Sequence, residues 1–144
     1  MPQAMPTDIQ ERCEIIEESY EFTLSFAARG LSSEEDADHG TQIRYYLGRT
    51  AEAIAGLQAS CAAAIQEEHL APAERYEAFF KVLARDAQDA LAAVELVLAQ
   101  PVISSQLVDN LNASIHLRAL LTDLFLVTEL LELRQTRARA LASN

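Results

Sequence analysis

Residues 115–133 read IHLRALLTDLFLVTELLEL, and their apolar residues recur at steps of three and four. That spacing is the period of an α-helix, so this stretch predicts a long helix and an all-α fold. Two apolar stripes follow when the residues are placed on a helix. The broader stripe, which we expect to face the core, consists of Leu117, Leu120, Leu121, Leu124, Val127 and Leu131. The second stripe lies on the other side and consists of Ile115, Ala119, Leu126, Leu130 and Leu133.

The second stripe predicts a further partner for this helix, because a helix at the edge of a bundle needs only one apolar face. Two interpretations account for it. Either the helix pairs with another copy of the chain, or it lies at the centre of its own chain and is covered on both sides. Residues 112–133 also show a 3–4 alternation that resembles a short coiled-coil seam, which favours self-association.

The rest of the sequence predicts three more helices. Thr7 and Gln10 form a capping-box pattern, which predicts the start of a helix. Gly30 is a typical C-terminal stop for that helix. Pro72 suits the first turn of a later helix, and Pro101 ends that helix or opens the next connection. The expected helices span about residues 8–29, 34–70, 72–99 and 105–141.

Short connections between long amphipathic helices favour antiparallel neighbours, so we expect an up-and-down four-helix bundle with an overlong C-terminal helix. The chain of 144 residues, half of them apolar, forms one domain, residues 1–144, with a substantial core. The last expected helix is longer than the first and the third, and longer than the second if Gly40-Thr41 delays the regular part of that helix. It therefore either breaks near Asn110–Asn112 or projects beyond the bundle.

The charge of the chain excludes several function classes. With 22 acidic and 11 basic residues the net charge is −11, which argues against a nucleic-acid partner. The most apolar stretch, residues 117–133, contains four charged residues, so we expect no membrane span. Two cysteines and no signal-peptide pattern predict a reducing, cytoplasmic location for a soluble protein.

The first helix shows a surplus of apolar surface like that of the last. Ile15, Phe22 and Phe26 form a stripe beside the main apolar face of that helix, and we expect them to be a second contact patch. Our leading hypothesis is therefore a small interaction, adaptor or regulatory protein without catalysis or cofactor. It would form a homodimer or another homo-oligomer, with a further protein partner left open.

Acidic residues support an alternative hypothesis. The string Glu17-Glu18-Ser19-Tyr20-Glu21 is followed by Glu35 and Asp38, and carboxylates on adjacent antiparallel helices can hold Mg²⁺ that bridges substrate phosphates. Residues 16–38 resemble the all-α nucleoside triphosphate pyrophosphohydrolases of the MazG type. The resemblance implies an enzyme that uses Mg²⁺ to cleave nucleotides to monophosphate and pyrophosphate, and it implies a set of metal ligands. These would be Glu17, Glu18, Glu21, Glu35 and Asp38. The other interpretation of the same residues is a solvated acidic face.

Overall fold

The computed structural model describes residues 7–29 and 37–143, and for residues 37–40 it describes the backbone only. Every regular element in these ranges is an α-helix, so the all-α prediction is confirmed. The structure differs from the expected four helices, because two of the expected segments are interrupted. The six helices are α1 (Asp8–Ala28), α2 (Ala37–Ala55), α3 (Leu57–Glu67), α4 (Ala73–Leu98), α5 (Ser105–Ala113) and α6 (Ile115–Ala142).

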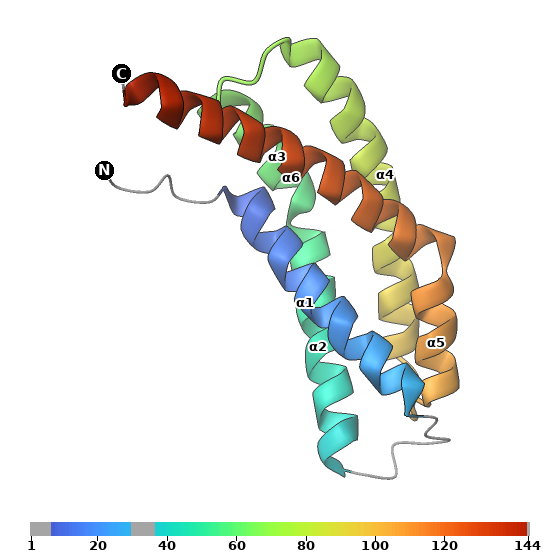
Figure 1. Cartoon of the computed structure of the whole chain (residues 1–144). Coiled ribbons are helices and arrows are strands. Elements are labelled where there is room, and N and C mark those ends of the chain that lie inside the picture. The colour runs from blue at the N-terminus through green and yellow to red at the C-terminus, as the bar shows by residue number, and fades with distance from the viewer. Residues whose placement is uncertain (1–6, 30–36, 144) are drawn as a thin grey trace.

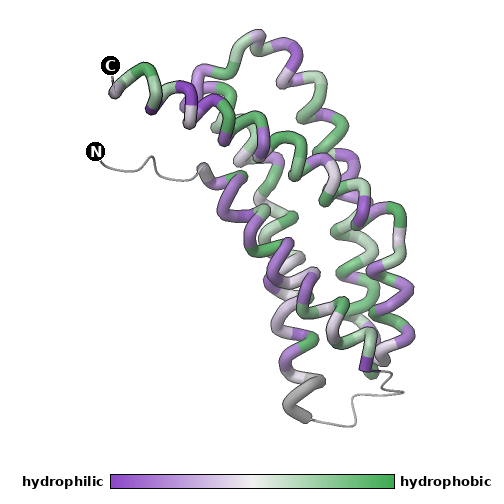
Figure 2. The backbone as a smooth tube through the Cα atoms, in the orientation of Figure 1, coloured by the Kyte–Doolittle hydropathy of each residue, from purple (hydrophilic) through white to green (hydrophobic). Residues whose placement is uncertain are grey.

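The helices run alternately down and up (Figure 1). The chain descends in α1, rises through α2 and α3, descends in α4, and rises again through α5 and α6. Helix α1 packs mainly against α2 and α5, and α4 packs mainly against α6 and α2. Hydrophobic and hydrophilic residues alternate along each helix (Figure 2), which allows every helix to bury one face in a shared core.

A glycine and an arginine explain the break between α2 and α3. Arg12 of α1 donates hydrogen bonds of 3.2 Å to the backbone carbonyls of Glu52 and Ala53, near the end of α2. A Cβ atom on Gly56 would clash with the Arg12 guanidinium, so glycine leaves room for the guanidinium in this position. The arginine therefore satisfies carbonyls at a helix end, and its positive charge favours that position.

Arginines close two other helix ends in the same way. Arg44 of α2 donates to the carbonyls of Leu98 and Gln100, at the end of α4, at 3.2 and 3.0 Å. Arg134 of α6 donates to the carbonyl of Glu68, after the last turn of α3, at 2.8 Å. Each of these arginines also joins two helices that are far apart in the sequence, so it positions one against the other.

A break at Ser114 separates α5 from α6 and lies just beyond the predicted Asn110–Asn112 region. Ser114 has an extended backbone, with φ −60° and ψ 133°, and its side chain accepts a hydrogen bond from the Leu117 amide. Helix α5 then packs against α1, where the Thr23 hydroxyl lies 3.0 Å from the Asn112 side-chain oxygen. The 28-residue α6 also projects beyond the other helices at its C-terminal end (Figure 1).

The position of α5 corrects the expectation that Phe26 belongs to an exposed contact patch. Phe26 is only 1% exposed and lies in the core of its own chain. The Ser105 hydroxyl, at the start of α5, donates to the Phe26 carbonyl at 2.9 Å. Leu24, which helical periodicity places on the main apolar face of α1 with Ile9 and Cys13, is instead exposed, because α5 approaches α1 from the side of Phe26.

Candidate interaction surface

Helix α6 buries one face and exposes the opposite one. The six residues that the sequence assigns to the core face are its buried residues, which confirms that prediction. On the opposite face Ile115 is 74% exposed, Leu126 50% and Leu133 57%. No described part of the chain covers these side chains, so the interpretation of a helix buried on both sides by its own chain is wrong. We call this face the outward stripe: Ile115, Ala119, Leu126, Leu130 and Leu133.

A shallow hollow lies at the N-terminal end of the outward stripe. It has a volume of about 440 Å³ and is lined by Ala113, Ile115, Arg118, Ala119 and Thr122. Four of these residues are spaced as i, i+3, i+4 and i+7 on α6. Four side chains on one helix face form the kind of hole that receives one side chain of a facing helix in a coiled coil. The spacing of these side chains therefore suits a side chain from a facing helix.

Charged residues beside the outward stripe are divided along its length. Arg118 lies near the N-terminal end of α6, whereas Glu129 and Glu132 lie in its C-terminal half. All three side chains are exposed, and none of them forms an ion pair within the described part of the chain. Within residues 115–133 the stripe thus has a basic N-terminal half and an acidic C-terminal half, whereas Arg134, Arg137 and Arg139 make the last turns of α6 basic again.

Two carboxyl groups face each other between α4 and α6. One Asp123 oxygen is shielded from solvent and has no hydrogen-bond partner among the described residues. Burial and the nearby Asp86 carboxyl, which shares a proton with Asp123 and repels a second charge, together raise the pKa of Asp123 to about 7. Near neutral pH the pair therefore holds one proton for part of the time. The spacing of residues along α6 does not show that Asp123 has a partner on α4.

We expect this carboxyl pair to make the protein less stable as the pH rises. The pKa of Asp123 is raised in the folded chain, so the folded chain holds an extra proton between about pH 4 and pH 7. Stability therefore falls as the pH rises through this window. The loss is of the order of 1–2 kcal/mol, because partial exposure of Asp123 screens the repulsion. Urea unfolding at pH 4.5 and pH 8, at one fixed protein concentration, measures it.

A matched pair of variants checks the origin of this pH dependence. Asp123→Asn keeps the shape and removes the repulsion, so it is expected to flatten the pH dependence and raise stability at pH 8. Asp89→Asn changes an exposed aspartate of α4 and is expected to leave the pH dependence in place. Equal effects of the two variants would show that general charge repulsion, rather than the Asp86–Asp123 pair, is responsible.

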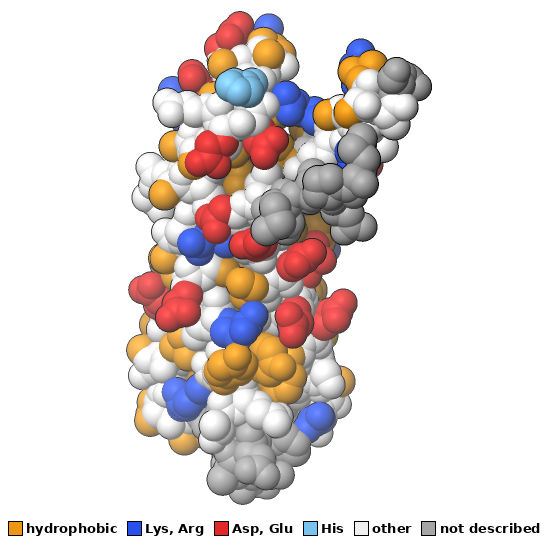
Figure 3. Space-filling model, turned by 90° about the vertical axis from the view of Figure 1, so that its left-hand side faces the viewer, with side chains coloured by type: hydrophobic (Ala, Val, Ile, Leu, Met, Phe, Trp, Pro, Cys, Tyr) orange, Lys and Arg blue, Asp and Glu red, His pale blue; other side chains and the backbone are white. Residues whose placement is uncertain are grey.

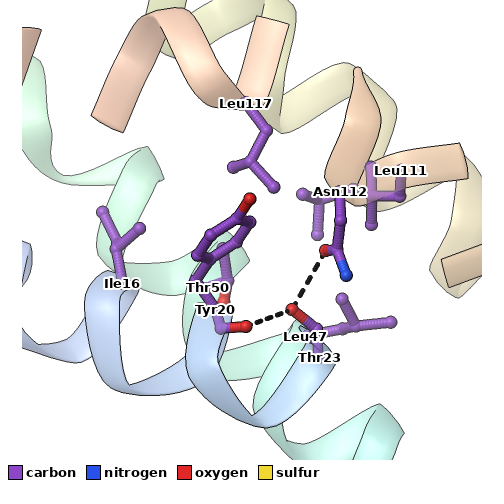
Figure 4. A pocket seen from close by; sticks show the side chains of 9 residues that line it. Ile16, Tyr20, Thr23, Leu47, Thr50, Leu111, Asn112 and Leu117 are labelled. Atoms are coloured by element: carbon purple, nitrogen blue, oxygen red, sulfur yellow. Dashed lines mark hydrogen bonds between the residues drawn. The ribbon is translucent and has the colours of Figure 1, made fainter. Parts of the chain in front are cut away.

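A small cavity lies in the core between α1, α2, α4, α5 and α6 (Figure 4). Its volume of about 10 Å³ has room for about one water molecule. The Thr23 hydroxyl lies within hydrogen-bond distance of the Tyr20 carbonyl and of the Asn112 side-chain oxygen, but its single proton serves one of them at a time. The Asn112 amide nitrogen has no partner among the described residues. The cavity is too small for an organic substrate.

The acidic residues of α1 do not converge on one point. Glu17 is half-buried and accepts a hydrogen bond from the Cys13 thiol, whereas Glu18 and Glu21 are exposed. Glu35 and the side chain of Asp38 lie outside the described residues, so the second half of the predicted magnesium site is not placed. Among the residues with described positions, no three His, Cys, Asp or Glu side chains form a group that could hold a metal ion. The magnesium enzyme stays a prediction.

The other predicted patch, on α1, is partly occupied by its own chain. Phe22 stacks on Tyr46 of α2 with ring centroids 4.3 Å apart, and Ile15 is half-buried. Tyr45 is exposed, touches Tyr46 edge-on, and has the Arg49 guanidinium 5.7 Å from its ring centre. Hydrophobic side chains gather on the lower part of this face (Figure 3). The sequence reasoning did not identify the α2 residues of this cluster, although two adjacent tyrosines were a visible signal.

Within the described ranges, none of the helices is both long and apolar enough to cross a membrane. Comparison of the chain with protein-family models, with curated proteins and with solved structures finds no match.

Proposed function

We propose that this chain is a cytoplasmic interaction protein that self-associates through the outward stripe of α6 and acts through contacts rather than catalysis. The observation that carries the proposal is the exposure of the outward stripe directly opposite the buried face of the same helix. Both cysteines are free and buried, which fits a reducing compartment.

The distribution of exposed apolar side chains supports a contact on α6. Eleven large hydrophobic residues are exposed in the described part of the chain, and six of these lie on α6. Single exposed hydrophobic residues are normal on any protein, whereas a line of them along one helix marks an interaction surface. The outward stripe is such a line, and it spans most of five helical turns.

A double substitution tests the proposal. Leu126→Glu combined with Leu130→Glu places two charges in the middle of the outward stripe. Because both side chains are exposed and glutamate favours helices about as well as leucine, we expect the variant to stay folded. The unsubstituted protein is expected to elute as an oligomer and the variant as a monomer of 15.9 kDa in size-exclusion chromatography with light scattering.

The matched control carries the same two charges elsewhere. Gln58→Glu combined with Ala62→Glu uses the same four-residue spacing on exposed positions of α3, and it is expected to remain oligomeric. An oligomer that survives Leu126→Glu with Leu130→Glu would show that the outward stripe is not the contact.

A further inference from the structure

The outward stripe has an internal pattern that goes beyond its apolar character. Ala119, the smallest of its residues, lies near one end, whereas Glu129 interrupts the apolar residues near the other end. Arg118, Phe125 and Glu132 follow one edge of the stripe at intervals of seven residues. In a two-stranded pairing of helices, this pattern determines which direction of pairing places opposite charges together.

We infer that two copies of the chain pair through α6 in antiparallel orientation, around a two-fold axis close to residue 124. This inference rests on the proposed self-association and adds its geometry. A closed two-fold contact uses the same surface on both copies, so every contact occurs twice.

Antiparallel pairing matches the two ends of the stripe in size and charge. Ile115 then lies opposite Leu133 of the partner subunit, and Thr122 lies opposite Leu126 of the partner subunit. Ala119 lies opposite Glu129 of the partner subunit, where its small side chain leaves space for the carboxylate. The adjacent Arg118 supplies the opposite charge, so Glu129 and Glu132 of each copy lie near Arg118 of the other.

Antiparallel pairing also brings together opposite charges along the edge of the stripe. In this orientation the edge with Arg118, Phe125 and Glu132 faces the same edge of the other helix. Arg118 approaches Glu132 of the partner subunit on this edge, and Phe125 approaches its own counterpart at the centre. These residues are exposed in the single chain, so they are available for the contact. The hollow beside Ile115 and Ala119 receives a side chain from the C-terminal half of the partner's α6.

Parallel pairing is unfavourable for the same residues. Glu129 would face its own counterpart within the seam, and like charges that face each other there destabilise a pair. Ala119 would also face its own counterpart, which leaves a gap between two small side chains. The pattern of the stripe therefore selects the antiparallel arrangement.

Disulfide formation between substituted residues tests the direction. Burial raises the pKa of Cys13 and of Cys61 to about 12, so both native thiols stay protonated and unreactive. We expect Phe125→Cys, and an equal mixture of Ile115→Cys with Leu133→Cys, to form disulfide-linked dimers on mild oxidation. Ile115→Cys alone is expected to form none, because its two copies would lie roughly 27 Å apart along the helix axis.

The readout is the shift from the 15.9 kDa chain to a dimer on a non-reducing gel, with the linked peptides identified by mass spectrometry. Gln88→Cys, on an exposed position of α4, is the matched control and is expected to give no linked dimer. Light scattering of each reduced variant shows whether the pair itself is intact.

The outcomes separate this inference from the proposed function. A linked dimer from Ile115→Cys alone would establish parallel pairing and overturn the inference, whereas self-association through α6 would stand. A dimer by light scattering that forms no disulfide at positions 115, 125 or 133 would place the contact elsewhere, and it would overturn both the inference and the proposed contact on α6. Monomers at every concentration would overturn the proposed function as well.

Discussion

Leu124→Glu is expected to unfold the protein, whereas Leu126→Glu, two residues further along α6, is expected to leave the fold intact. Leu124 is completely buried, while Leu126 is half exposed on the opposite face of the helix. A carboxylate at position 124 would have no hydrogen-bond partner in an apolar core, so we expect a loss of more than about 4 kcal/mol in the free energy of unfolding. Urea unfolding followed by circular dichroism measures both variants.

Conservative substitutions at the same positions are the controls. Leu124→Met keeps the volume and the apolar character, and it is expected to cost less than about 1.5 kcal/mol. Leu126→Gln tests whether the protein tolerates a neutral polar side chain at position 126 as well as it tolerates glutamate. If Leu124→Glu remained as stable as the unsubstituted protein, or Leu126→Glu unfolded, the assignment of the two faces of α6 would be wrong.

The second large effect concerns Arg12 and Gly56. Arg12→Ala is expected to lower the free energy of unfolding by about 2 kcal/mol, because the carbonyls of Glu52 and Ala53 lose a charged donor. Gly56→Ala is also expected to destabilise the protein, since the added methyl group displaces the Arg12 guanidinium.

The sign of the Gly56→Ala effect is expected to reverse once Arg12 is removed. Gly56 has φ −89° and ψ −4°, a helical conformation in which alanine is more favourable than glycine. With Arg12→Ala in place, Gly56→Ala is therefore expected to stabilise the protein by about 0.5–1 kcal/mol. A double-mutant cycle from urea unfolding at one protein concentration gives the coupling between the two positions.

Gly48→Ala provides the matched control for this cycle. Nothing lies within 4 Å of a Cβ built at Gly48, which lies within α2. We expect Gly48→Ala to be stabilising by about the same 0.5–1 kcal/mol with and without Arg12. Additive effects of Arg12→Ala and Gly56→Ala would contradict our explanation of the break between α2 and α3.

The two faces of α6 could be predicted from the sequence because helical periodicity is a local signal. All six predicted core residues are buried, and the residues predicted on the opposite face remain accessible. The start of α1 was equally local, since Thr7 and Gln10 form the predicted capping box, with the Gln10 side chain 2.8 Å from the Thr7 amide.

The breaks at Gly56 and Ser114 could not be predicted with the same certainty. A single glycine within a helical pattern is compatible with an unbroken helix, and what distinguishes Gly56 is the guanidinium of Arg12, 44 residues earlier. Ser114 caps α6, but the position of α5 depends on its packing against α1. These features depend on tertiary contacts, which periodicity does not contain.

The chemistry between helices was also beyond the sequence. The proximity of Asp86 to Asp123 depends on how α4 and α6 are aligned, and the burial of Phe26 depends on where α5 packs. The candidate surface, in contrast, could be predicted from the sequence. Its residues could be named in advance, because a second apolar stripe on one helix is visible without knowing any neighbour.

The mass of the unsubstituted protein in solution tests the central claim most directly. Sedimentation velocity over a series of concentrations, from below to well above one micromolar, measures that mass without any substitution. Self-association through the outward stripe predicts a species of twice the chain mass of 15.9 kDa that increases with concentration. A single species of 15.9 kDa at every concentration would contradict it.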